Sequence, residues 1–130
     1  MKKTKRKDVG YIGEDLAIDY LEKRGYKIVE RNFKCRFGEI DLIARIENRL
    51  VFVEVKLKKG EKYCKPIEAV DYAKQKKVIK SSLFYVQKYR IDNLDVQFDV
   101  VGIELEQGKT PNIIHIENAF EPSDLDIKGW

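Results

Sequence analysis

The sequence has few of the residues on which several classes of protein depend. Its two cysteines, Cys35 and Cys64, are too few for a disulfide framework and lack the spacing of a zinc site. It has no glycine-rich phosphate loop, which argues against nucleotide hydrolysis. No apolar run reaches the roughly 18 residues that a membrane span needs. The basic residues 1–8 are not followed by an apolar segment, as a secretory signal would be. We therefore expect one soluble domain in the cytoplasm.

The chain also has a single histidine. His115 lies in an apolar run, Ile113 to Ile116, and we interpret it as a packing or surface residue rather than a catalytic base. With no second histidine, histidine-dependent hydrolysis is disfavoured. Asp99 lies in another apolar run, where we expect it to form local hydrogen bonds, and we assign it no role.

Charged residues are abundant and unevenly distributed. The chain has 26 basic and 22 acidic residues, a formal charge of +4. Residues 1–8 alone carry +4, residues 56–90 hold eleven basic and three acidic side chains, and residues 91–130 hold two basic and nine acidic ones. A polyanion would be attracted to the first two segments. The solvated face of a lysine-rich helix would produce the same pattern, so charge alone leaves both interpretations open.

Apolar spacing predicts one α/β domain over residues 9–120, between a flexible basic arm (1–8) and an acidic tail (121–130). The expected helices cover 9–24 and 66–89, with Pro66 opening the second, and the expected strands cover 27–34, 39–46, 50–57, 95–105 and 112–118. The order helix, three strands, helix, two strands indicates a mixed sheet flanked by helices.

Polar residues interrupt two of these strands. In 50–57, valines alternate along one face, while Glu54 and Lys56 continue the other face, which begins with Leu50 and Phe52. In 39–46, we expect Asp41 to point away from the face shared by Ile40, Leu42 and Ala44. If the turn pairs Ile46 with Val51, Asp41 lies opposite Lys56 and on the same face as Glu54. A shift of one residue would send Asp41 to the other face.

These side chains suit a divalent cation. Asp41 and Glu54 offer the hard anionic oxygens that Mg²⁺ or Mn²⁺ prefers, and the main-chain carbonyl of Val55 could add a ligand. Lys56 would lie beside a metal-bound water or a phosphate and stabilise negative charge there. Glu14 would add a carboxylate if its helix packs on this face. An Asp41–Lys56 salt bridge on an exposed face explains the spacing equally well.

Several motifs together resemble a known family. They are Gly13-Glu14 with Ala17, Arg31-Asn32-Phe33, Gly38-Glu39-Ile40-Asp41-Leu42-Ile43-Ala44, Val51-Phe52-Val53-Glu54-Val55-Lys56, Lys74-Gln75-Lys76-Lys77 and Phe98-Asp99-Val100-Val101. In this combination the sequence resembles the small bacterial YraN (UPF0102) family. That family is grouped with the Holliday-junction-resolvase-like members of the PD-(D/E)XK nuclease superfamily, which has a restriction-endonuclease-like fold.

The resemblance implies a metal-dependent endonuclease that hydrolyses phosphodiester bonds of DNA, including branched or structured DNA. It implies Asp41, Glu54 and Lys56 as the catalytic signature, Glu14 as the acid of the first helix, and Lys74 as a helix residue near the site. Two positions depart from the pattern. Phe37 replaces a small residue, and Gln97 replaces an arginine that could contact phosphate.

The nucleic-acid contacts expected with this activity come from lysines that touch phosphates without reading sequence: Lys58, Lys59, Lys74, Lys76 and Lys77. A resolvase would also need a homodimer to cut two strands. A non-catalytic nucleic-acid-binding accessory protein of the same fold is the alternative. A protein-interaction module that docks its basic helix on an acidic partner is a third.

Overall fold

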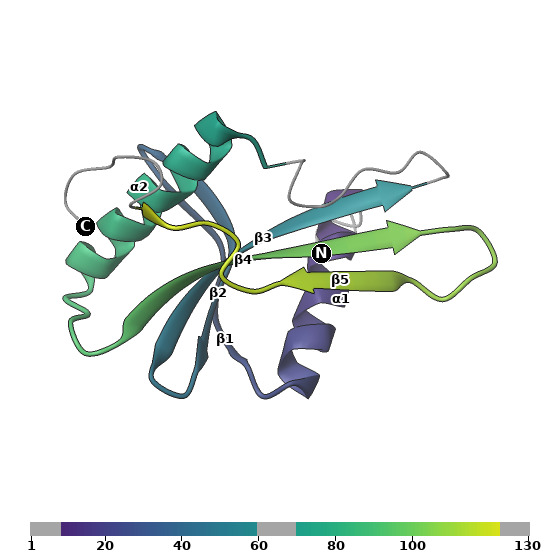
Figure 1. Ribbon diagram of the computed structural model, residues 1–130, viewed down its shortest axis with the longest axis horizontal. Helices are drawn as coiled ribbons and strands as arrows, with labels where there is room; N and C mark the ends of the chain where they lie inside the picture. Colours follow the sequence, from purple (N-terminus) through teal and green to yellow (C-terminus); the bar gives the residue numbers. More distant parts are fainter. Residues whose placement is uncertain (1–8, 60–69, 123–130) are drawn as a thin grey trace, which may run out of the picture.

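The computed structural model describes residues 9–59 and 70–122. The expected basic arm, Cys64, Pro66 and all but the first residues of the acidic tail lie outside the described residues. Within them the chain forms two helices and five strands: α1 Val9–Lys23, β1 Lys27–Cys35, β2 Gly38–Ile46, β3 Arg49–Lys59, α2 Tyr72–Lys88, β4 Asp95–Leu105 and β5 Asn112–Ile116 (Figure 1). None of these helices is long and apolar enough to cross a membrane.

The strands form one mixed sheet in the order β1-β2-β3-β4-β5. β3 and β4 are parallel, with α2 in the connection between them, and the other neighbouring pairs are antiparallel. The mixed α/β fold with the order α-β-β-β-α-β-β is as predicted, and it is consistent with a nuclease-like fold.

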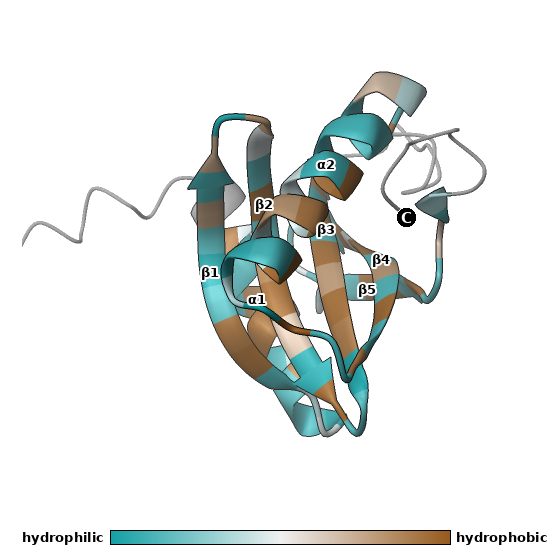
Figure 2. Cartoon of the chain, turned by 90° about the vertical axis from the view of Figure 1, so that its left-hand side faces the viewer, coloured by the Kyte–Doolittle hydropathy of each residue, from teal (hydrophilic) through white to brown (hydrophobic). Residues whose placement is uncertain are grey.

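The two helices cover opposite faces of the sheet. On the α1 face, Ala17 and Leu21 pack on Val51, Val53 and their neighbours. On the α2 face, buried residues of the helix join a cluster that includes Phe52 and Phe98. Hydrophobic residues follow the middle of the sheet, while the outward side of α2 is hydrophilic (Figure 2). Both faces of the central strands are therefore buried, which explains their nearly continuous apolar sequence.

α2 begins later than Pro66 predicted. The helix starts at Tyr72, and the Asp71 carboxylate caps it by accepting the Lys74 N–H at 2.8 Å. Tyr72 itself is 55% exposed. The buried side of the helix consists of Val78, Ile79, Ser81, Ser82 and Tyr85. The Lys74 side chain is directed toward β3, where its Nζ lies 3.5 Å from Glu54 Oε1.

The β1–β2 pair changes its packing partners part-way along. Leu42 and Ala44 belong to the α1 cluster, but Ile40 belongs to the α2 cluster, so the expected common face for these three residues is wrong. The change coincides with Asn32 of β1, whose φ of 56° lies in the left-handed region and breaks the strand alternation. Asp41 lies at the point where β2 changes face.

Candidate metal and phosphate site

The candidate site lies where two neighbouring strands separate. β2 pairs with β3 from Leu42↔Val53 to Ile46↔Arg49. Beyond Leu42, β2 stays paired with β1, whereas β3 beyond Val53 stays paired with β4 as far as Lys59. The two strands therefore fork at Asp41 and Glu54, and the same register places these residues opposite each other. A fork leaves main-chain groups without a ladder partner, which other groups must satisfy.

The predicted hairpin register is wrong by two residues. We expected Ile46 to pair with Val51, but it pairs with Arg49 across a tight turn at Glu47 and Asn48. Asp41 is consequently opposite Glu54 rather than Lys56. A shift of two residues preserves the parity of the pairing, so Asp41 still comes to the strand position that carries Glu54. The error changes which residue lies opposite Asp41.

Asp41 bridges the fork. Its Oδ2 accepts the main-chain N–H of Val55 at 2.8 Å. The N–H and C=O of one strand residue face the same neighbour, so the Val55 carbonyl also faces the fork. Burial raises the pKa of Asp41, while the Val55 hydrogen bond and the ammonium groups of Lys74 and Lys56 lower it in part.

Glu54 is the least satisfied acid of the site. It is fully buried, and among the described residues neither of its oxygens has a hydrogen-bond partner. Lys74 Nζ of α2 lies 3.5 Å from its Oε1. Burial first, and then the Asp41 carboxylate, raise the pKa of Glu54 to about 8, although Lys74, Lys56 and the main-chain N–H of Asp41 lower it in part. That N–H lies outside hydrogen-bond geometry. The protein thus holds a buried acid in surroundings that favour a proton or a cation on it.

The donor set fits a hard divalent cation. The fork brings together three kinds of oxygen ligand. They are the unpartnered carboxylate oxygens of Glu54, the carboxyl group of Asp41 opposite it, and the main-chain carbonyl of Val55. Across the described ranges, no three histidine, cysteine, aspartate or glutamate side chains form a group that could hold a metal ion. These residues would therefore supply part of a coordination sphere, leaving room for water and phosphate, which is usual for Mg²⁺.

Glu14 approaches from the opposite face. The sequence left open whether the helix of Glu14 packs over the face that carries Glu54, and α1 covers the other face. Glu14 Oε1 accepts hydrogen bonds from Arg31 Nε and Asn32 Nδ2, each at 3.1 Å. Burial raises the pKa of Glu14, Arg31 lowers it, and the nearby Asp41 carboxylate raises it further. Glu14 is thus a neighbour of Asp41 that β1 holds in place.

The Arg31–Asn32 clamp was not predicted as part of the site. The motif Arg31-Asn32-Phe33 was noticed only for its resemblance to the family. Arg31 also forms an ion pair with Asp15 at 2.9 Å. The sequence does show two polar side chains, Arg31 and Asn32, directly before the buried Phe33. That they bind Glu14 of α1 could not be predicted, because it depends on how the helix packs on the sheet.

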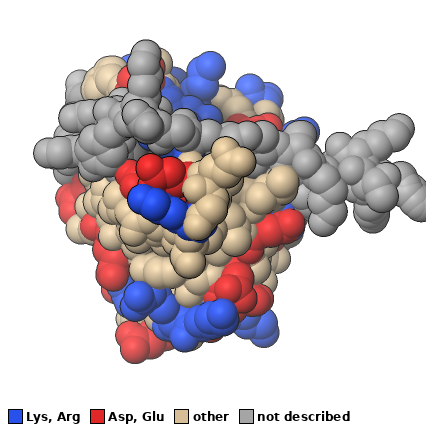
Figure 3. Space-filling model, turned by 90° about the vertical axis from the view of Figure 1, so that its right-hand side faces the viewer, with Lys and Arg blue, Asp and Glu red and all other residues tan. Residues whose placement is uncertain are grey.

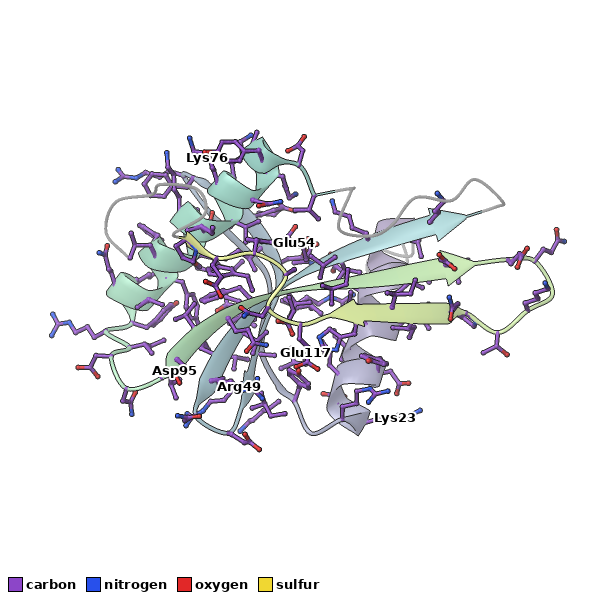
Figure 4. The ribbon with its side chains drawn as sticks, viewed as in Figure 1. Lys23, Arg49, Glu54, Lys76, Asp95 and Glu117 are labelled. Atoms are coloured by element: carbon purple, nitrogen blue, oxygen red, sulfur yellow. The ribbon has the colours of Figure 1, made fainter. Side chains whose placement is uncertain are left out.

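The predicted nucleic-acid contacts lie on two elements beside the fork. Lys58 and Lys59 follow Lys56 on β3, and Lys76 and Lys77 follow Lys74 on α2. The side chain of Lys59 lies outside the described part. Figure 4 shows Glu54 beneath the first turns of α2, with Lys76 on the outer side of that helix. By contrast, the side of the molecule in Figure 3 carries basic and acidic side chains interspersed over its described residues.

His115 and Asp99 form a separate buried pair on the α1 face. His115 Nε2 lies 2.7 Å from Asp99 Oδ2, and both side chains are at most 5% exposed. Asp99 also accepts hydrogen bonds from Gln97 Nε2 at 2.9 Å and the Asn118 N–H at 3.0 Å. His115 is thus a packing residue. The hydrogen bond of Asp99 with Gln97 is local, as expected, whereas those with His115 and Asn118 join it to residues distant in the sequence. Gln97, which stands where the family pattern has an arginine, belongs to this network and also accepts a hydrogen bond from Arg49.

Comparison with known proteins identifies the family. The model of the Uncharacterised protein family UPF0102 matches residues 13–103. The UPF0102 protein of Caldanaerobacter subterraneus subsp. tengcongensis is 44% identical over 92% of this chain and its own full length. The UPF0102 protein of Syntrophus aciditrophicus is 46% identical over 91% of this chain and 92% of its own. The matched segment contains most of α1, the forked strands and Lys74, and the chain belongs to the UPF0102 (YraN) family.

Proposed function

We propose that the fork between β2 and β3 is the active site of a divalent-metal-dependent nuclease that hydrolyses phosphodiester bonds in DNA. The observation that carries the proposal is the buried carboxyl group of Glu54, which has no hydrogen-bond partner among the described residues and lies opposite Asp41. Burying such a group costs free energy, and a stable fold retains it when a ligand uses it. The resemblance to PD-(D/E)XK nucleases supports the same assignment.

In this proposal Asp41, Glu54 and the Val55 carbonyl hold Mg²⁺ or Mn²⁺. The cation, when bound, would lower the pKa of a coordinated water and neutralise charge on the phosphate. The hydrogen bond from the Val55 N–H fixes the orientation of Asp41, so the carboxyl group needs little rearrangement. Glu14, held by Arg31 and Asn32 on the α1 side, would offer a further carboxylate to the cation or to a water.

Lys56 supplies positive charge where negative charge develops. It follows Glu54 on the same face of β3, and it acts electrostatically on both acids. From there its ammonium group would stabilise the phosphate oxygens during attack. Lys58, Lys59, Lys74, Lys76 and Lys77 would contact flanking phosphates, which gives affinity without sequence preference. We place the protein in the cytoplasm and expect it to act as a homodimer if the substrate is branched, since two strands must then be cut.

The test is cleavage of linear, flapped and four-way DNA with Mg²⁺ or Mn²⁺. We expect Asp41→Asn and Lys56→Ala each to reduce the rate by at least about a hundredfold, because each removes a group from the reacting centre. Asp19→Asn is the matched control, since Asp19 lies on the exposed side of α1 in an ion pair with Lys23. Cleavage that survives Lys56→Ala would contradict the assignment.

A non-catalytic nucleic-acid-binding role is the second candidate. It is favoured by the engagement of Asp41 with Val55 and of Glu14 with Arg31 and Asn32, which leaves Glu54 as the one unpartnered acid of the three. This role predicts salt-sensitive DNA binding that is independent of divalent cations. Absence of cleavage of every substrate, together with such binding, would decide for it.

A further inference from the structure

Lys74 reaches the fork from a different layer of the molecule than the acids it meets. It occupies the third residue of α2, and its main-chain N–H is held by the Asp71 cap. Its side chain crosses to β3, where Nζ lies 3.5 Å from Glu54 Oε1. The backbone of Lys74 is thus fixed while its four-carbon side chain retains its rotational freedom.

The contact with Glu54 is electrostatic rather than a formed hydrogen bond. Charge-assisted N–H···O bonds are about 2.7–2.9 Å long, so a separation of 3.5 Å leaves both Glu54 oxygens without a hydrogen-bond donor. The Lys74 side chain is 36% exposed, whereas that of Glu54 is 1% exposed. The ammonium group therefore lies at the boundary between the buried acid and the solvent and can turn outward without breaking a buried contact.

A divalent cation on Glu54 and the Lys74 ammonium group would compete for the same carboxylate. Two cations within a few ångströms repel each other strongly where water is partly excluded. A phosphate group changes this balance, because it offers the ammonium group a new anionic partner directly outside the fork. Lys56 also acts electrostatically on Glu54, but from the same strand.

We infer that Lys74 is an exchangeable counter-ion that couples cation binding to phosphate binding: it rests against Glu54 in the metal-free protein and moves to a backbone phosphate when a divalent cation takes its place. This inference rests on the proposed function. It makes the two ligands cooperative, since each one removes a competitor of the other. By linkage, the factor by which phosphate strengthens cation binding equals the factor by which the cation strengthens phosphate binding.

The experiment measures Mn²⁺ affinity by calorimetry with and without a short phosphorothioate DNA strand that resists hydrolysis. Without DNA, and above about pH 8 so that Glu54 is ionised, we expect Lys74→Met to bind Mn²⁺ about tenfold more tightly than the wild type, because the competing charge is gone. With DNA, the affinity of the wild type should rise about tenfold more than that of Lys74→Met, in which a phosphate oxygen can still bind the cation but displaces no competing ammonium group. Asp41→Asn measures the Mn²⁺ that the DNA itself binds.

Lys80→Met is the matched control, because it removes the same charge from an exposed position of the same helix. It should bind Mn²⁺ like the wild type in both conditions. Equal Mn²⁺ affinities for the wild type and Lys74→Met without DNA, or tightening by DNA that is equally large in the two proteins, would overturn the inference and leave the metal site standing. A wild type that binds no Mn²⁺ would overturn the proposed function as well.

A variant that does not fold would not block the test. Lys74→Gln keeps a polar side chain of similar length, and it should show the same loss of coupling. The wild type alone also tests the linkage, since Mn²⁺ should raise its affinity for the DNA strand by the same factor by which DNA raises its affinity for Mn²⁺. Independent binding of the two ligands to the wild type would overturn the inference.

Discussion

Two carboxylic acids lie fully buried on neighbouring strands of the same sheet, and their surroundings differ in kind. Asp99 of β4 accepts three hydrogen bonds, from His115, Gln97 and Asn118. Glu54 of β3 has no hydrogen-bond partner among the described residues and a lysine 3.5 Å away. The first arrangement satisfies a buried charge within the fold, whereas the second leaves an acid available to something outside it.

The difference follows from where each residue lies in the sheet. Asp99 pairs with Val53, inside the continuous β3–β4 ladder, and β5 brings His115 over it. Glu54 follows Val53 directly, at the residue where β2 leaves β3. Strand separation thus removes the neighbouring groups that would have formed hydrogen bonds with the acid. A buried acid by itself does not identify a ligand site, because Asp99 is buried too. What distinguishes Glu54 is that the fold supplies no hydrogen-bond partner for it among the described residues.

The largest expected effect is on stability at Asp99. Replacing it with leucine leaves His115, Gln97 and the Asn118 N–H without their acceptor in a buried place, so Asp99→Leu should lower the free energy of unfolding by about 3–4 kcal/mol. Urea denaturation followed by circular dichroism measures this. Asp95→Leu, at an exposed position of the same strand, is the control and should change stability little. An unchanged midpoint for Asp99→Leu would show that the network contributes no stability.

The opposite sign is expected at Glu54. Glu54→Met replaces an unpartnered buried acid by an apolar side chain of similar size, so it should raise the free energy of unfolding by about 2 kcal/mol in the presence of a chelator. The same variant should lose all Mn²⁺-dependent stabilisation. If Glu54→Met were as destabilising as Asp99→Leu, the contrast between the two acids would not hold.

The third effect is spread over several pH units and concerns the proton on Glu54. Its pKa in the folded protein, raised from 4.5 to about 8, means that the folded state binds more protons than the unfolded state between these values. The stability that this proton contributes is complete below about pH 4.5 and is lost as the pH rises through about 8, with a slope of at most about 1.4 kcal/mol per pH unit. Thermal unfolding between these pH values, with chelator, should show this fall in the wild type and not in Glu54→Met. Parallel curves for the two proteins would contradict the assignment.

The sequence predicted the helices and strands better than it predicted their contacts. Strands 50–57 and 95–105 were found because runs of valine and isoleucine specify a buried strand locally. The start of α2 was missed because Pro66 is a general signal for a first turn, while the actual cap is the Asp71 side chain on the Lys74 N–H. The hairpin register was missed by two residues because strand periodicity cannot distinguish registers that differ by two.

For the candidate site, the sequence predicted that Asp41, Glu54 and Lys56 come together, from the parity of residue numbers alone. In the structure Asp41 lies opposite Glu54, and Lys56 acts electrostatically on both acids. The sequence did not predict the clamp of Arg31 and Asn32 on Glu14, which depends on helix and strand packing. It also did not show that α1 covers the opposite face. The catalytic, metal-binding and nucleic-acid-binding roles stay predictions.

The amino-acid sequence by itself therefore determined the order of the elements, the apolar faces of the central strands and the common face of the charged residues on β3. These depend on local periodicity and need no knowledge of the rest of the chain. Only the tertiary structure decided that β2 and β3 separate at Asp41 and Glu54, that Lys74 turns toward the sheet, and that Asp99 is satisfied while Glu54 is not. These outcomes depend on which distant groups come within hydrogen-bonding distance, and that is settled by packing.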